Sequence, residues 1–134
     1  MAALTITAAN VIPVSGYSFQ TRLSAAAISI GQSLYIDAND KWALADADAL
    51  ATAVCKAISL SQAAAANQPV IGITGGDLGL GAILTVGIPY CVGLAAGSIG
   101  PYSDLASGDF PCLVGWPTTT ANLRLAFVAS TVAI

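Results

Sequence analysis

Short apolar segments separated by turn residues constrain this fold more than any other feature of the sequence. Apolar and polar residues alternate most cleanly between Leu123 and Phe127, where Leu, Leu and Phe are interleaved with Arg and Ala. A period of two is typical of a strand with one buried face. Turn-forming residues recur roughly every eight to twelve positions, as in the Asp-Ala-Asn-Asp run at 37–40. The sequence therefore predicts an all-β, single-domain β-sandwich or β-barrel of short strands, with at most one short helix.

The expected elements follow from the same pattern. Glycine-containing tight turns are expected at 75–77 and 107–109, and Asp46 is expected to cap one helical turn of alanines. Strands are expected at 17–22, 26–30, 34–36, 41–44, 53–60, 70–74, 80–86, 89–92, 110–116 and 123–131.

Residues 1–15 are expected to be an N-terminal arm, and residues 16–134 a single β-rich domain. The arm carries no charge, and its alternation at Leu4 and Ile6 indicates a strand. Pro13 removes a backbone donor, which suits an edge, and the Ser-Gly pair at 15–16 offers a hinge. Two interpretations stay open: an arm that pairs with a neighbouring molecule, or the first strand of the domain's own sheet.

Charged residues are scarce. They make up 8% of the 134 residues, against about 25% in a typical soluble domain, whereas hydrophobic residues make up 56%. A surface with so few charges predicts that part of it is covered by partner molecules. The alternative is an Ala/Gly-rich monomer coated with Ser, Thr, Asn and Gln.

Two classes of partner are disfavoured by the sequence. The four Lys and Arg residues are scattered and the net charge is −3, so no basic face for nucleic acid is expected. The longest uncharged stretch, 78–103, is interrupted by glycine or proline every few residues, and we interpret it as strands and turns rather than a membrane helix. The N-terminus lacks the features of a signal peptide.

The chemistry of an enzyme is also not expected. Histidine and glutamate are absent, so serine or cysteine nucleophiles lack their usual base, and no calcium loop ending in Glu can form. The glycines at 72–81 lack the Lys-Ser/Thr of a phosphate loop. Cys55, Cys91 and Cys112 match no zinc spacing and are expected to be small buried hydrophobic residues in a protein made in a reducing cytosol. We expect no catalytic residue, cofactor or metal.

Interface residues are sought among the aromatic and N-terminal apolar residues. Most aromatic side chains are expected in the core. Trp42, next to a polar turn, and Trp116, before Pro117 and three threonines, are the better candidates for interface anchors, with the core as the equal alternative. The candidate interface set is Leu4, Ile6, Val11, Ile12, Trp42 and Trp116.

Several motifs, in order along nearly the whole chain, resemble a family of tailed-bacteriophage capsid cement (head decoration) proteins. They are Leu-Thr-Ile-Thr-Ala-Ala-Asn-Val-Ile-Pro at 4–13, Gly-Gln-x-Leu-Tyr at 31–35, Lys-Trp-x-Leu-Ala-Asp-Ala-Asp at 41–48, the small residues before Gln-Pro-Val at 63–70, Gly-Ile-Pro-Tyr at 87–90, Gly-x-Ile-Gly-Pro at 97–101, Asp-Leu-x-Ser-Gly at 104–108 and Leu-Val-Gly at 113–115. The low charge and the three cysteines depart from the family pattern.

The resemblance implies a structural protein that is synthesised in the host bacterial cytoplasm and resides on the capsid exterior of the virion. Its partners would be the major capsid protein and copies of itself, as a homotrimer, and it would stabilise contacts between capsid subunits. The alternative function is a phage tail-fibre or receptor-binding β module.

Overall fold

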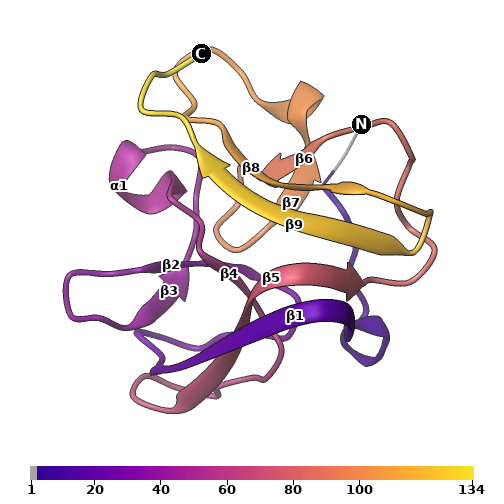
Figure 1. Cartoon of the computed structure of the whole chain (residues 1–134). Coiled ribbons are helices and arrows are strands. Elements are labelled where there is room, and N and C mark those ends of the chain that lie inside the picture. Colours follow the sequence, from indigo (N-terminus) through magenta and orange to yellow (C-terminus); the bar gives the residue numbers. More distant parts are fainter. Residues whose placement is uncertain (1–2) are drawn as a thin grey trace.

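The computed structural model describes residues 3–134 and contains 42% strand and 8% helix (Figure 1). The expected all-β class with a single short helix is confirmed. The helical segments are η1 (Ala8–Asn10), α1 (Leu50–Ala53) and η2 (Tyr102–Asp104). The strands are β1 (Ile12–Leu23), β2 (Ser33–Ile36), β3 (Trp42–Leu44), β4 (Ala57–Ser59), β5 (Pro69–Gly79), β6 (Tyr90–Val92), β7 (Ile99–Pro101), β8 (Cys112–Pro117) and β9 (Asn122–Ala129).

All nine described strands belong to one antiparallel sheet, curled into a half-barrel. The order is β3-β2-β4-β5-β9-β8-β6-β7, and β1 branches from this path by pairing with β5. Strand β5 contacts β4 at 72–73 and β9 at 76–79, while β1 follows it from 69 to 79. Because a strand has only two edges, β4 and β9 share one edge of β5, and β1 occupies the other.

Buried side chains form two hydrophobic cores. Successive side chains of a strand point to opposite faces of the sheet, so that Ala57 and its neighbour Ile58 on β4 belong to different cores. Leu78, Leu123 and Pro117 stand opposite one another on β5, β9 and β8, and all three are buried. The larger core includes Ile58, Ile73, Leu78, Leu80, Tyr90, Val92, Ile99, Val114 and Leu123. The smaller core contains Ile28, Leu34, Trp42, Ala57, Ala63 and Val70.

The glycine pair at 75–76 was expected to form a tight turn, which is wrong, because β5 runs unbroken from Pro69 to Gly79. Gly76 has a φ of +92°, and a Cβ there would lie 2.6 Å from the backbone of Gly16 and Tyr17. Glycine therefore permits a bulge and a close approach of β1 to β5 rather than a chain reversal.

Four other local expectations are also wrong. Segments 26–30 and 80–86 are not strands, although Ile28 makes an isolated bridge to Ala63. Helix α1 begins after Ala49, so Asp46 is not its cap. β1 continues through Pro13 and Gly16, so the Ser-Gly pair is an irregularity within a strand and not a hinge between elements. The turn at 107–109 is confirmed.

The uncharged stretch 78–103 contains the end of β5, turns, β6, β7 and the start of η2, so short strands and turns make it up as expected, although the strand expected at 80–86 is absent. No helix within residues 3–134 is both long enough and apolar enough to cross a membrane.

The three cysteines are buried, as the sequence predicts, and all are free thiols. Burial raises the pKa of the Cys91 thiol to about 11, and it raises the pKa of Cys55 and Cys112 above the ordinary thiol value.

Since the thiolate is the reactive form, we expect maleimide labelling of the three cysteines at pH 8 to be at least about 100-fold slower in the native protein than in denaturant. Mass spectrometry over time measures this, and rapid native labelling of any cysteine would contradict it.

Candidate interaction surface

The N-terminal segment before β1 lies against its own domain. Leu4 donates its backbone N–H to Ile99 O at 2.8 Å. Leu4, Ile6 and Val11 are half-buried and pack on the larger core. Ile6 also lies close to Gly31: a Cβ added to Gly31 would be 2.7 Å from Cγ2 of Ile6. These three candidate interface residues therefore make intramolecular contacts, while the fourth, Ile12, is 57% exposed at the start of β1.

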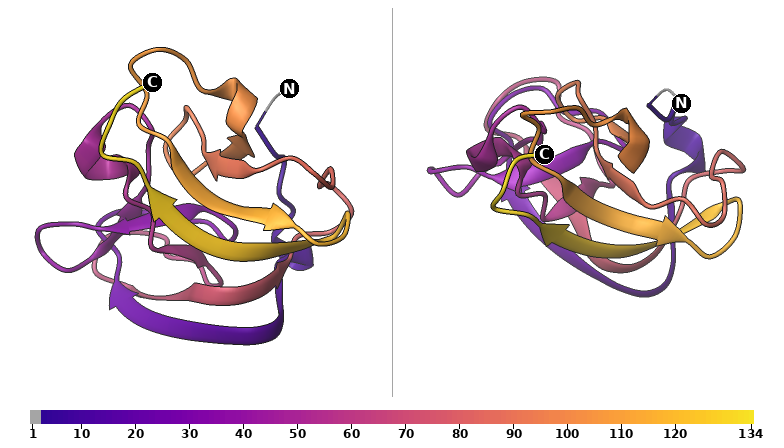
Figure 2. Two further views of the ribbon diagram at one scale, coloured as in Figure 1. Left: turned by 45° about the horizontal axis from the view of Figure 1, so that its top comes forward. Right: turned by 90° about the horizontal axis from the view of Figure 1, so that it is seen from above.

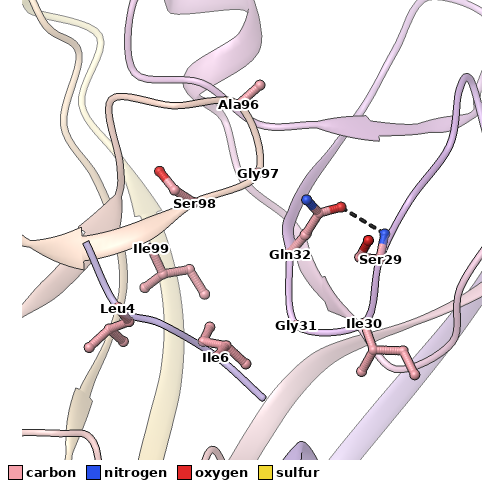
Figure 3. Close-up of a pocket in the computed structure, with 10 residues that line it drawn as sticks. All are labelled: Leu4, Ile6, Ser29, Ile30, Gly31, Gln32, Ala96, Gly97, Ser98 and Ile99. Atoms are coloured by element: carbon pink, nitrogen blue, oxygen red, sulfur yellow. Dashed lines mark hydrogen bonds between the residues drawn. The ribbon is translucent and has the colours of Figure 1, made fainter. Parts of the chain in front are cut away.

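A shallow pocket of about 230 Å³ opens beside this segment (Figure 3). Leu4 and Ile6 form one side, and the loops at 29–32 and 96–98 form the other. Ser29 N–H donates to Gln32 Oε1 at 2.8 Å, which ties one loop to itself. Because small-molecule sites usually occupy at least about 300 Å³, we assign no ligand to this pocket.

The two tryptophans have opposite environments. Trp42 is 0% exposed and lies in the smaller core, whereas Trp116 on β8 is 46% exposed. The guanidinium of Arg22 lies over the Trp42 ring at 5.5 Å, and the indole N–H of Trp42 is 3.4 Å from Gln20 O. Trp42 is thus unavailable to a partner in this fold, while Trp116 is available.

Strand β1 presents the densest group of exposed apolar side chains. Five of the fifteen exposed large hydrophobic residues in the described chain lie on it. We call this group the β1 ribbon: Ile12, Val14, Tyr17, Phe19 and Leu23. They are 45–57% exposed, and the rings of Tyr17 and Phe19 stack with centroids 5.0 Å apart. The only charged residue on β1 is Arg22.

A second exposed surface, the outer sheet face, is defined by Asp77, Arg124, Trp116 and Val128. Asp77, Arg124 and Trp116 are cross-strand neighbours on β5, β9 and β8. Arg124 Nε lies 3.1 Å from Asp77 Oδ1, and this hydrogen bond lowers the pKa of Asp77 and raises that of Arg124. Val128 is 61% exposed on β9. The face thus combines an exposed Trp with a paired charge.

Sequence reasoning missed Tyr17 and Phe19 as surface residues because most aromatic residues were expected in the core, and it made no prediction for Leu23. The available signal was the uncharged run that continues without interruption from the N-terminal segment to Thr21. Apolar side chains in an uncharged edge strand remain exposed when no other layer covers them.

The aspartates serve local structure. Asp37 accepts the N–H groups of Asn39 and Lys41, and Asp46 accepts that of Asp48. The neighbouring Asp46 charge raises the pKa of Asp48. In the part of the chain that the structure describes, no group of three or more His, Cys, Asp or Glu residues could hold a metal ion.

No family model, curated protein or solved structure matches this chain.

Proposed function

We propose that this protein is a non-enzymatic capsid decoration protein that binds the outer surface of an icosahedral phage head and stabilises contacts between major capsid subunits. The observation that carries the proposal is the exposure of large apolar side chains on the β1 ribbon and the outer sheet face in a chain with 8% charged residues. Apolar patches of this kind mark surfaces that bind other proteins. The resemblance of the ordered sequence motifs to capsid cement proteins supplies the identity of the partner.

The proposed mechanism is binding alone. Each copy makes a modest contact, and the symmetry of the head repeats it many times, so that avidity multiplies a weak affinity. We assign the capsid contact to the outer sheet face, with the 46% exposed Trp116 as its anchor, because tryptophan is enriched among the few interface residues that dominate binding energy. Self-association, as a homotrimer in the resembling family, is part of the same proposal.

The substitution Trp116→Ala tests the capsid contact. We expect it to weaken binding to purified heads lacking this protein by about 30-fold or more, because an interface tryptophan typically contributes at least about 2 kcal/mol. Co-sedimentation with heads measures the binding. The control is Tyr102→Ala, which removes a 48% exposed aromatic from η2.

If the Trp116→Ala and Tyr102→Ala variants bound heads equally well, Trp116 would not be part of the capsid interface. A wild-type protein that binds host cells but not heads would overturn the capsid proposal and favour a receptor-binding module.

A further inference from the structure

The outer edge of β1 is left open, whereas two other edge strands, β7 and β3, each accept a backbone hydrogen bond from a neighbouring segment. Leu4 donates to Ile99 O on β7, and Ala25 donates to Trp42 O on β3. Among residues 3–134, β1 pairs only with β5, and no backbone group of another segment bonds to its far edge. In the left view of Figure 2, β1 runs along the margin of the molecule with no segment beyond it. An open edge offers unpaired N–H and C=O groups to another strand.

Only the C-terminal part of β1 is regular enough to pair. Register shifts interrupt its pairing with β5 between Pro13 and Phe19, and such bulges turn an edge away from partners. From Phe19 to Leu23 the register is continuous, with Phe19 opposite Ile73 and Leu23 opposite Pro69. In this stretch Phe19, Thr21 and Leu23 lie on one face and Gln20 and Arg22 on the other.

We propose that residues 19–23 pair antiparallel with the same residues of a second copy, about a two-fold axis at Thr21. In this register, Phe19 faces Leu23 of the second copy, Thr21 faces Thr21, and Gln20 faces Arg22. Aromatic–aliphatic and Thr–Thr cross-strand pairs both stabilise antiparallel sheets. Because the two Arg22 side chains face Gln20 rather than each other, no like charges meet.

The surrounding side chains extend this apolar contact. Thr21 stands opposite Ile71 on β5, which is 41% exposed on the same face as Phe19 and Leu23. Tyr17 stacks on Phe19. With the edge backbone, these groups would bury roughly 500 Å² per copy, or about 1,000 Å² in total, which reaches the lower limit for a specific interface.

The second copy is favoured over a foreign strand because the edge is complementary to itself. A protein with net charge −3 repels its own copies, and pairing is least opposed where the surface carries no acidic group. β1 has none. A contact with two-fold symmetry joins copies in pairs. If a different surface of the protein forms the homotrimer, the β1 contact would link one trimer to another.

A cysteine at the axis tests the register. The substitution Thr21→Cys introduces an exposed thiol, whereas the three native cysteines are buried. Under mild oxidation we expect a covalent dimer on a denaturing gel, because residues facing each other across a strand pair have Cβ atoms about 4.5–5.5 Å apart, and a small movement brings them to the separation of about 3.5–4.5 Å that a disulfide requires. Val14→Cys is the matched control, since two copies of Val14, 45% exposed on the same strand, would be more than about 40 Å apart in this register. Equal cross-linking of the two variants, or none at position 21, would overturn the proposal.

Charge substitutions test the pairing independently of cysteine chemistry. Phe19→Asp and Leu23→Lys should each weaken self-association at least tenfold. At protein concentrations between the dissociation constants of wild type and variant, the average sedimenting mass should therefore fall towards half, while far-UV circular dichroism stays unchanged. The double variant F19D/L23K places Asp opposite Lys twice in the proposed register and should recover most of the association. Single variants that sediment like the wild type, or a double variant no better than either, would refute it. These measurements use the isolated protein, so their outcome is separate from binding to heads.

Discussion

Replacing Trp42 with alanine is expected to lower the free energy of unfolding by about 3–5 kcal/mol, which is the usual cost of removing a large buried aromatic side chain. Trp42 is 0% exposed and packs with Leu34, Ala57 and Val70 in the smaller core. The substitution also removes the ring beneath the guanidinium of Arg22. Because a domain of this size is stable by only about 5–15 kcal/mol, the variant should lie close to the unfolding threshold.

Urea denaturation followed by far-UV circular dichroism measures this loss, and Trp116→Ala is the matched control. Trp116 is 46% exposed, so its removal should change the free energy of unfolding by less than about 1 kcal/mol. If the two tryptophan variants lost stability equally, the assignment of Trp42 to the core and Trp116 to the surface would be wrong.

The different environments of these tryptophans could not be predicted from their sequence neighbours. Each is flanked by turn-forming or polar residues, and the sequence left core and interface open for both. The space for Trp42 is made by small residues distant in the chain: a Cβ on Gly72 would lie 3.1 Å from its ring and 2.8 Å from the Cβ of Ala57. These positions come together in the folded sheet, where β4 pairs with β5 and, through β2, lies next to β3.

Local alternation predicted the β class because it reports directly on which side of a strand is buried. β9 has the expected pattern, with Leu123 and Leu125 buried and Arg124 exposed. Glycine was less informative, since a positive φ serves a turn and a bulge equally well. For this reason the Gly75-Gly76 pair was expected to end a strand that in fact continues.

The candidate surface was predictable only in part. Ile12 and Trp116 are exposed as the interface prediction requires, but the central residues of the β1 ribbon, Tyr17 and Phe19, were expected in the core. Exposure of an edge strand depends on whether another layer covers it, which is a property of the whole topology. Whether these exposed residues contact a capsid stays a prediction.

The double substitution of Leu4 and Ile6 by alanine is expected to lower the free energy of unfolding by about 2–4 kcal/mol. Full truncation of a buried Leu or Ile costs about 2–5 kcal/mol, and half-burial reduces the loss to about 1–2 kcal/mol for each residue. Both side chains pack against the larger core, and Leu4 also carries the hydrogen bond to Ile99 O. An arm that contacts only neighbouring molecules would give a different result, because its removal would leave the isolated domain as stable as before.

The interleaved residues supply the control for this experiment. Thr5 and Thr7 are exposed in the same segment, so the double variant T5A/T7A shortens side chains without removing core contacts and should stay within about 0.5 kcal/mol of the wild type. The urea midpoint should be measured at several protein concentrations, because intramolecular packing makes the loss independent of concentration. A loss of unfolding free energy seen only at high protein concentration would mean that residues 4–6 pack on a neighbouring molecule. If the double variant lost no stability at any concentration, the segment would be an arm that does not pack on its own domain.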